Sequence, residues 1–372
     1  MSDFKLKRMG LIMEPEKGNP LEVEGVLNPA AVRGPDGNLY LFPRIVAKGN
    51  YSRIGIAKVT FDKNGEPVGV ERLGIALEPT TDYELRPNGG GGCEDPRITF
   101  VEPLGYYVMT YTAYGPNGAR IALAKSADLF HWERLGLATF SPYKGIEFGS
   151  VYNKDASVFP YAIPNPDKHK GLALLHRPLF EGTRPEDTIK QSHAHSRHVD
   201  LHRESIWISY CPLDLEEDGH LHICKFTSHH RLASPVEPWE SLKIGGGPPP
   251  ILTKHGWLFI YHGVSEANVH NGFQMCYSAG VMILNEEYPQ FIKYRSKKPI
   301  LTPKTAHERK GVVDEVVFPT GLDRRDDLGE PNRIDVYYGM ADKVIGVARL
   351  NVPEILPSVS MKDAPQEEIT NA

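Results

Sequence analysis

Two adjacent carboxylates stand directly after a run of four glycines, in the stretch NGGGGCEDPRITF of residues 88–100. Glycine lets the backbone approach other groups closely, which suits a loop that lies against a ligand. Pro96 fixes its own φ and biases Asp95 towards an extended conformation. Because side chains alternate along an extended chain, Glu94 and Asp95 are expected to point to opposite sides. One carboxylate would then face the reacting atom, and the other would bind or orient the ligand.

The same stretch has two simpler interpretations. One is a glycine-rich turn in which Asp95 caps its own backbone while Glu94 and Arg97 form a surface ion pair. The other is a phosphate-binding loop, but the stretch has neither the Lys-Ser/Thr ending nor the GxGxxG spacing of such loops. This stretch alone does not distinguish a catalytic segment from a glycine-rich turn, so the rest of the sequence is needed.

Strand-like runs recur along the chain in the same order, which is typical of repeat-built β architectures. Each copy begins with a polar cluster and continues with segments rich in β-branched and aromatic residues. Gly and Pro number 35 and 31 residues, and no long segment has helical periodicity. We predict five copies, formed by residues 28–46 and 52–61; 93–114 and 119–136; 154–163, 170–178 and 205–215; 246–264 and 275–284; and 314–322, 334–341 and 343–350.

Copies spaced roughly 60 to 90 residues apart predict an all-β fold, a five-bladed β-propeller with a central-channel active site. In a propeller the innermost strand of each blade lines the central channel, so residues on these strands converge. The innermost strands would carry Asn28, Asp95, Asp155, the run 245–250 and Asp314. Five separate polar clusters would thus form one site. A β-sandwich, in which the same residues only mark turns, is the alternative.

Composition and charge narrow the classes of function. The chain has 372 residues, of which 40% are hydrophobic and 24% charged, as in ordinary globular proteins. A net charge of -5 and a pI near 6.3 provide no basic surface, so neither nucleic acid nor a membrane is an expected partner. No stretch approaches membrane-spanning length, and the first 20 residues do not look like a secretory signal. Four scattered cysteines predict reduced thiols, and we expect a cytoplasmic location.

Ordered motifs cover the chain from Asn28 to about Ala348: GGGGCEDPRIT, NKDASVFP, LLHRP, KIGGGPPPI with GWLFIYHGV, and DEVVFPTGL with YYGMADKVIGVA. Together they resemble the motifs of glycoside hydrolase family 130. Members of that family are mainly inverting β-mannoside phosphorylases on a five-bladed β-propeller, with some hydrolases. The resemblance implies a single propeller domain over residues 1–372, with extensions at about 1–20 and 352–372 and an insertion at about 180–204.

The resemblance also implies a role for each candidate site residue. Asp95 would be the single catalytic carboxylate, a general acid towards the glycosidic oxygen. Phosphate would be bound by Arg177, Lys243 and His262. The mannosyl ring and its neighbour would be surrounded by Asn28, Arg44, Arg53, Glu94, Asp155 and Asp342. The implied reaction converts a β-mannoside and inorganic phosphate to α-D-mannose 1-phosphate, with no metal and no organic cofactor.

The chemistry of phosphorolysis makes sense of that set of residues. Inverting hydrolysis needs two carboxyl groups, one to protonate the leaving oxygen and one to activate water. Phosphate is already an anionic nucleophile, so it needs no base and must be held by positive groups. A phosphorylase should therefore show one acid and a cationic cluster.

Two other functions stay open on this scaffold. A hydrolase would need a second carboxylate on the far face of the sugar, for which Glu181, Glu186 or Glu204 is available in the insertion. A non-catalytic sugar-binding propeller would hold the same ligand without turnover. The sequence determines neither the linkage, β-1,2 or β-1,4, nor the acceptor sugar, and a homo-oligomer is compatible with it.

The insertion carries four histidines, His193, His195, His198 and His202. Such spacing can bind a metal, but no flanking cysteine or ordered ligand pattern supports this. We expect instead a polar loop that shapes the acceptor subsites, with Arg184, Arg197 or Arg203 near phosphate. Most aromatic candidates are expected in the core, and some are expected to stack on sugar faces: Tyr107, Tyr111, Tyr114, Trp257, Tyr261 and Tyr277.

Overall fold

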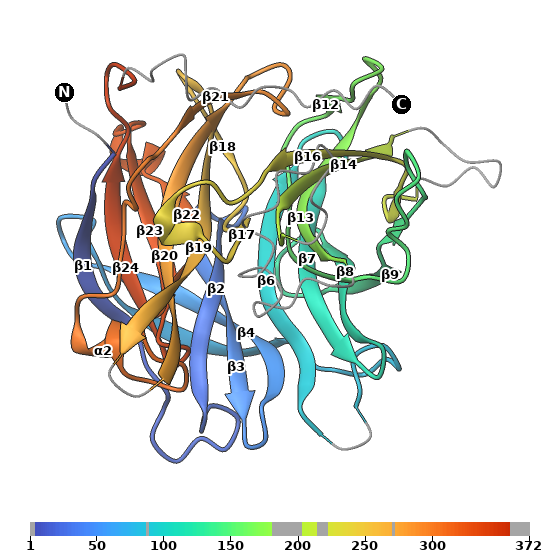
Figure 1. Cartoon of the computed structure of the whole chain (residues 1–372). Helices are drawn as coiled ribbons and strands as arrows, with labels where there is room; N and C mark the ends of the chain where they lie inside the picture. Colours follow the sequence, from blue (N-terminus) through green and yellow to red (C-terminus); the bar gives the residue numbers. More distant parts are fainter. Residues whose placement is uncertain (1–3, 87–88, 181–202, 214–221, 270–271, 358–372) are drawn as a thin grey trace.

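The computed structural model describes residues 4–86, 89–180, 203–213, 222–269 and 272–357, and it is all-β (Figure 1). In this part of the chain the helical segments are one short α-helix and two 3-10 turns: α2 (Ala306–Arg309), η1 (Pro238–Glu240) and η2 (Asp326–Leu328). The predicted all-β class is confirmed. Within the described residues, no helix has the length and apolar character needed to cross a membrane.

Most of the described strands fall into five antiparallel runs of four, each strand pairing with the next. The runs are β2 (Gly25–Arg33), β3 (Leu39–Ala47), β4 (Tyr51–Phe61) and β5 (Pro67–Leu77); β6 (Gly91–Val101), β7 (Tyr106–Gly115), β8 (Gly118–Ser126) and β9 (Glu133–Leu137); β11 (Tyr152–Val158), β13 (Lys170–Leu179), β14 (Ile206–Pro212) and β16 (Ser228–Ala233); β17 (Lys243–Gly246), β19 (Gly256–Val269), β20 (Gly272–Leu284) and β21 (Ile292–Arg295); and β22 (Val317–Arg324), β23 (Arg333–Met340), β24 (Val344–Asn351) and β1 (Leu6–Met13).

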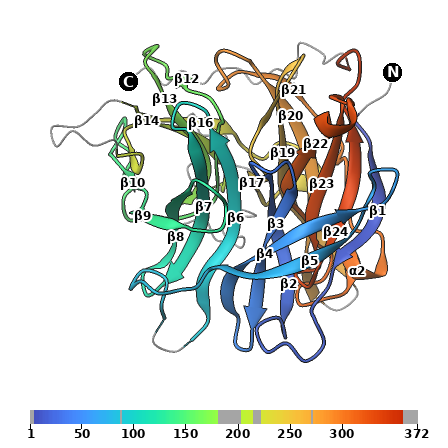
Figure 2. The same cartoon turned by 180° about the vertical axis from the view of Figure 1, so that it is seen from behind.

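Short strands and one parallel pairing complete the sheets. The short strands are β10 (Thr139–Phe140), β12 (Ile163–Pro164), β15 (Lys225–Phe226) and β18 (Ile251–Thr253). Tyr51 and Ser52 of β4 pair in parallel with Gly91 and Gly92 of β6. This pairing joins the first two runs into one sheet of eight strands, seen from behind in Figure 2.

Sequence reasoning found the inner strands of the runs and missed most of the outermost ones. The strands β5, β16 and β21 were not predicted. An outermost strand pairs on one side only, so glycine and charged residues are tolerated there, as in PVGVERLGIAL of β5. The strand β1 lies within residues 1–20, which were predicted to be an N-terminal extension. It is instead the outermost strand of the last run, paired with β24.

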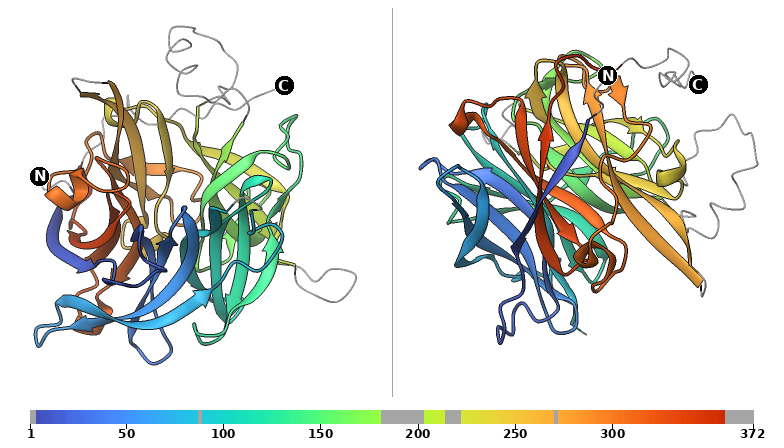
Figure 3. Two further views of the ribbon diagram at one scale, coloured as in Figure 1. Left: turned by 90° about the horizontal axis from the view of Figure 1, so that it is seen from below. Right: turned by 90° about the vertical axis from the view of Figure 1, so that its left-hand side faces the viewer.

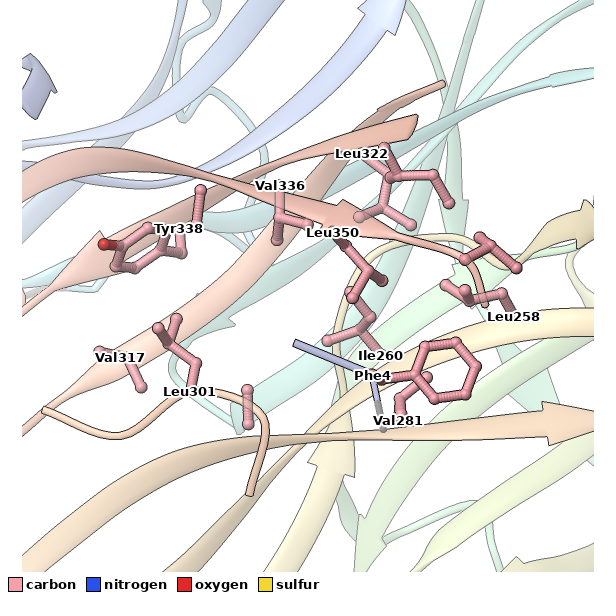
Figure 4. Close-up of a cluster of buried hydrophobic side chains, with 14 of the residues drawn as sticks. Phe4, Leu258, Ile260, Val281, Leu301, Val317, Leu322, Val336, Tyr338 and Leu350 are labelled. Carbon is pink, nitrogen blue, oxygen red and sulfur yellow. The ribbon is translucent and has the colours of Figure 1, made fainter. Parts of the chain in front are cut away.

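Five clusters of buried hydrophobic side chains lie between consecutive runs. The cluster between the fourth and fifth runs includes Ile260 and Val336, and it also holds Phe4 from the N-terminal segment (Figure 4). Another cluster joins the fifth run to the first, with Val347 of β24 and Val26 of β2 as members. Seen from below, the runs follow one another in chain order around the molecule (Figure 3, left). Burial between runs is therefore what holds the sheets together.

Three of the runs each contain a hydrogen-bonded trio of the same residue types: a buried glutamate, a tyrosine and an arginine. In the second run, Glu84 accepts hydrogen bonds from the Tyr111 hydroxyl at 2.6 Å and from Arg134 Nε at 2.9 Å. In each trio the tyrosine lies on the second strand of its run and the arginine on the outermost strand. The equivalent trios of the fourth and fifth runs are Glu240, Tyr261 and Arg295, and Glu308, Tyr338 and Arg8.

Candidate active site

The first strands of neighbouring runs contact one another and carry the candidate site: β2 contacts β6 and β22, and β11 contacts β6 and β17. Three of these strands have a β-bulge at a predicted site residue. Asn28, Asp95 and Asp155 have φ of 45°, 49° and 55°, and the pairing register shifts at each of them. Asp95 was predicted to be extended because Pro96 follows it, and this prediction was wrong. The bulge overrides the local preference and re-aims the side chain.

Asp95 lies in a hydrogen-bond network with residues of the first run. Its Oδ1 accepts from Asn28 Nδ2 at 2.9 Å and from Arg44 Nη1 at 3.4 Å. Arg44 Nη2 donates to Glu94 Oε1 at 2.8 Å. Glu94 and Asp95 thus reach the same guanidinium, and their predicted separation to opposite sides does not hold. The bulge breaks the alternation on which that prediction rested.

Arg97 fixes the backbone at Asp95, the predicted general acid, by hydrogen bonds to main-chain carbonyl oxygens. Its side chain is buried, Nη1 donates to the Asp95 carbonyl oxygen at 2.6 Å, and Nε donates to the Gly247 carbonyl oxygen at 2.8 Å. Burial lowers the pKa of Arg97, while the carboxylates of Asp155 and Asp95 oppose that shift. The surface pair of Glu94 with Arg97 is therefore excluded. Arg97 instead ties the bulge of β6 to the glycine segment after β17.

Asp342 adds a third carboxylate to Glu94 and Asp95. It lies in the tight turn between β23 and β24, where Ala341 and Asp342 have φ of 47° and 50°. Burial raises the pKa of Asp342 to about 6, with Arg44 opposing the shift and Asp95 and Glu94 adding to it. Burial also raises the pKa of Glu94, against the attraction of Arg44. We call this group the acid cluster: Asn28, Arg44, Glu94, Asp95 and Asp342.

A second charged group surrounds Asp155. Arg177 Nε donates to Asp155 Oδ2 at 2.6 Å, and His262 Nε2 lies 3.6 Å from the same oxygen. A Cβ on Gly245 would be 2.3 Å from that oxygen, so this glycine leaves room for the group. Burial acts to raise the pKa of Asp155, but Arg177 and His262 lower it below its usual value. Burial lowers the pKa of His262 to about 3, so its ring is neutral at pH 7.

Glu204 lies where sequence reasoning placed phosphate. It lies two residues before the start of β14, is buried, and forms an ion pair with Arg177 Nη1. Lys243 Nζ is 4.0 Å from Glu204 Oε1. Burial, followed by the charge of Arg177, lowers the pKa of Lys243 to about 8. We call this group the cation cluster: Arg177, Lys243, His262, Asp155 and Glu204.

Several buried polar atoms of the candidate residues have no hydrogen-bond partner in the described structure: Asn28 Oδ1, Arg53 Nη1, and His262 Nδ1 and Nε2. Arg53 pairs through Nε with Glu78 at 2.6 Å and lies 4.6 Å from the Tyr51 ring centroid. Its described contacts thus lie outside the acid cluster. Because buried polar atoms are normally satisfied, these atoms suit a site that a polar ligand completes.

Gly91 and Gly92, the two glycines directly before Cys93, pack against protein rather than leaving space for a ligand. A Cβ on Gly91 would lie 2.1 Å from the Tyr114 carbonyl oxygen, and one on Gly92 would lie 2.3 Å from the Ser52 carbonyl oxygen. Both glycines have positive φ. The expected loop against a ligand is therefore wrong for these two residues. They are glycine because strands β4, β6 and β7 approach one another closely here.

The aromatic candidates divide between the core and the site. Four are buried in the core, as predicted: Tyr107, Tyr111, Trp257 and Tyr261. Tyr114 and Tyr277 are half-buried, and Lys243 Nζ lies 5.8 Å from the Tyr277 ring centroid. Burial raises the pKa of Tyr277, while Arg177 lowers it and the Asp342 carboxylate raises it further. Tyr277 is thus within electrostatic range of both clusters.

Much of the insertion lies outside the described residues, including Glu181, Arg184, Glu186, His193, His195, Arg197, His198 and His202. Arg203 is described, and its Nη2 donates to the Ser241 carbonyl oxygen at 3.1 Å.

Asp314 was predicted to lie on an innermost strand, and this prediction was wrong. Asp314 precedes β22 and pairs with Lys310. Among the residues with a described position, no group of three His, Cys, Asp or Glu side chains could hold a metal ion.

Comparison with known proteins identifies the family. Residues 6–361 match the family described as beta-1,4-mannooligosaccharide phosphorylase. The chain belongs to glycoside hydrolase family 130. This family-130 chain is 32% identical over 361 residues to the 1,2-beta-oligomannan phosphorylase of Thermoanaerobacter sp., covering 95% of this chain and 99% of the relative. It is 40% identical over 304 residues to the beta-1,4-mannooligosaccharide phosphorylase of Ruminococcus albus, covering 80% of this chain and 74% of the relative.

A solved structure shares the fold. The beta-1,2-mannobiose phosphorylase from Listeria innocua, solved with beta-1,2-mannobiose, has a TM-score of 0.62 at 22% identity. The match covers 91% of the family-130 chain and 97% of that chain. The resemblance to family 130 that the motifs indicated is confirmed.

Proposed function

We propose that this family-130 enzyme is an inverting phosphorylase that transfers the mannosyl group of a β-mannoside to inorganic phosphate. The products are α-D-mannose 1-phosphate and the shortened sugar. The observation that carries the proposal is the division of the site into one acid cluster around Asp95 and one cation cluster around Arg177. The named relatives, which are phosphorylases of β-1,2 and β-1,4 mannosides, support the same reaction class.

In the proposed reaction Asp95 is the general acid. It gives its proton to the glycosidic oxygen, directly or through a sugar hydroxyl, as the bond from that oxygen to the anomeric carbon breaks. A phosphate oxygen forms the new bond to the anomeric carbon from the opposite face, so the β configuration becomes α. Asn28 and Arg44 orient the Asp95 carboxyl through the hydrogen bonds that they donate to it.

The cation cluster provides the proposed phosphate site. Arg177 and Lys243 bring positive charge, and Lys243 keeps most of it at pH 7 because its pKa is about 8. The neutral His262 ring contributes a hydrogen bond rather than a charge. The mannosyl ring and its neighbour are assigned to the remaining candidates, which are Asn28, Arg44, Arg53, Glu94, Asp155 and Asp342.

We propose a five-bladed β-propeller as the finer architecture, one domain over residues 1–372 with the insertion at about 180–204 and a C-terminal extension at about 352–372. Each run of four strands would be one blade. The hydrophobic clusters support this, because one lies between each pair of consecutive runs and another lies between the last run and the first. A ring of five blades needs that arrangement of buried surface.

The proposed reaction uses a β-mannoside and inorganic phosphate, and it needs no metal and no organic cofactor. A cytoplasmic location fits it, because phosphate and a use for sugar phosphates are both found inside the cell. Offering α-D-mannose 1-phosphate with a panel of acceptor sugars tests the linkage. Phosphate release identifies the acceptor, and the product's linkage separates β-1,2 from β-1,4 synthesis.

Replacing Asp95 with asparagine tests the assignment of the acid. We expect the phosphorolysis rate with a β-mannoside to fall by about 10²- to 10⁴-fold, because general acid catalysis contributes that much. The control is Asp167→Asn, the same change at an exposed position. Undiminished turnover in the Asp95 variant, with both proteins folded by circular dichroism, would remove Asp95 from its role.

A hydrolase is the second candidate, and the position of Glu204 favours it. Its carboxylate lies beside the expected nucleophile site, where it could remain in place and activate a water molecule that attacks the sugar instead of phosphate. Assays with and without phosphate separate the two functions. Release of free mannose in phosphate-free buffer, at the rate seen with phosphate, would contradict the phosphorylase proposal.

A further inference from the structure

The five described residues that define the cation cluster carry no net formal charge, while one further positive charge, that of the buried Arg97, acts on Asp155 and His262 from outside the cluster. Arg177 and Lys243 are its two cations, Asp155 and Glu204 its two carboxylates, and the His262 ring is neutral. The formal charges therefore cancel. Inorganic phosphate is a mixture of monoanion and dianion near neutral pH, and it would meet two carboxylates in the place where it has to bind, which opposes its binding.

The two carboxylates hold different parts of the Arg177 guanidinium. Asp155 takes Nε, and Glu204 takes Nη1. Lys243 Nζ is 4.0 Å from Glu204 Oε1. Glu204 thus lies against both cations to which phosphate is assigned. A carboxylate and a phosphate compete for the same guanidinium edge, because both are recognised by paired N–H donors.

Of the two carboxylates, Glu204 is the one that we expect to move. Asp155 sits in a bulge, where His262 lies near the oxygen that Arg177 holds, and these two residues lower its pKa. Glu204 is fixed through its backbone, since its carbonyl oxygen accepts a hydrogen bond from the Ile244 amide at 3.1 Å. A change of its side-chain rotamer would leave this backbone hydrogen bond in place.

We propose that the Glu204 carboxylate occupies the phosphate subsite of the free enzyme and is displaced when phosphate binds. Glu204 thereby sets the affinity for phosphate. The inference rests on the proposed phosphorylase function, and it adds a residue that competes with phosphate to those that bind it. In the free enzyme the Glu204 carboxylate lies beside Arg177 and Lys243 and offsets their positive charge. When phosphate binds, it takes the place of this carboxylate.

The test is Glu204→Gln, which keeps the size of the side chain and removes its charge. In phosphorolysis assays at saturating β-mannoside, we expect KM for phosphate to fall by about fivefold to tenfold, since one like charge leaves the anion site. The turnover number at saturating phosphate is determined in the same assays, so that the change in KM is measured separately from any change in kcat. The control is Glu102→Gln, an exposed residue whose replacement changes the net charge equally.

Calorimetric titration of the sugar-free enzyme with inorganic phosphate, and separately with sulfate, gives a second readout. Tighter binding of both anions by Glu204→Gln and by Glu204→Ala than by the wild type supports the proposal. Unchanged or weaker binding in both variants, with melting temperatures near that of the wild type, overturns it, because Glu204 would then be positioning Arg177. A wild type without phosphorolysis contradicts the proposed function instead, and the calorimetry still decides the role of Glu204.

Discussion

At the scale of single residues, the site depends on backbone conformations that most residues avoid. Asn28, Asp95, Asp155 and Asp342 all have φ between 45° and 55°. Left-handed backbone at a non-glycine residue costs on the order of 1 kcal/mol or more and persists when the surroundings impose it. At Asp95 the hydrogen bond from Arg97 to its carbonyl oxygen is one such constraint. Residues with positive φ also occur away from the site, as at Leu129 and Lys168, but at these four positions the unusual backbone aims side chains at one place.

Asp342 gives the site a pH-dependent cost in stability. Burial raises its pKa from 3.8 to about 6, so the folded protein binds this proton more tightly than the unfolded chain does. The stabilisation from this group is complete below pH 4 and is lost as the pH rises through 6. We expect Asp342→Asn to be more stable relative to wild type at pH 7.5 than at pH 4.5, by about 2 kcal/mol.

Melting temperatures of both proteins at the two pH values measure this difference. Asp82→Asn, the same change at an exposed aspartate, is the matched control. An Asp342→Asn effect of equal size at pH 4.5 and pH 7.5 would contradict a raised pKa for this carboxyl.

At the scale of elements, a repeated polar trio supports individual runs of strands from within. Each glutamate also accepts hydrogen bonds from two backbone amides just before it, as Glu84 does from Thr80 and Thr81. The trio thus connects the segment that enters a run, the second strand and the outermost strand. A buried carboxylate is tolerated there because an arginine and several donors satisfy it.

Removing the tyrosine hydroxyl from one trio should weaken the fold without affecting catalysis. We expect Tyr111→Phe to lower the free energy of unfolding by about 1–2 kcal/mol, because Glu84 loses a buried donor. Turnover should be unchanged, because Tyr111 packs in the core between the first two runs. Urea denaturation measures the stability. Tyr161→Phe, at a tyrosine that is 44% exposed, should have almost no effect, and equal losses in both variants would refute the role of the trio.

At the scale of the whole molecule, the N-terminal strand completes the last run. The strand β1 pairs with β24, its Arg8 bonds Glu308 at 2.7 Å, and Phe4 just before it is buried against the fourth and fifth runs. Residues from the first strand of the chain and from the last are thus packed into the same sheet. The first strands of the runs can then hold the acid cluster and the cation cluster in one place.

Phe4 should contribute to global stability although it lies near the end of the chain. It is 3% exposed, so Phe4→Ala should lower the free energy of unfolding by about 3 kcal/mol, as for other large apolar side chains removed from a core. Chemical denaturation gives the value. Ile355→Ala, at a residue that is 83% exposed, is the control. A Phe4→Ala protein as stable as that control would show that the burial of Phe4 does not contribute to global stability.

The sequence by itself determined the features that local pattern encodes. Alternating β-rich segments between Gly and Pro predicted the all-β class and the inner strands, because each segment has its own periodicity. The recurrence of polar residues at the start of each copy brought Asn28, Asp95 and Asp155 together as candidates. The ordered motifs were sufficient to identify the family. Asp314 was not placed correctly by its position in a repeat alone, because it pairs with Lys310 before β22 begins.

Only the tertiary structure decided where the side chains point and what surrounds them. The left-handed bulge at Asp95 contradicts the local preference of a residue before proline, and strand pairing imposes it. Gly91 and Gly92 are required by neighbouring strands, and Glu204 meets Arg177 across the third run. These features arise from contacts between residues far apart in the chain, so no pattern within one segment records them. The same reason explains why β1 was predicted as an extension and is part of the last sheet.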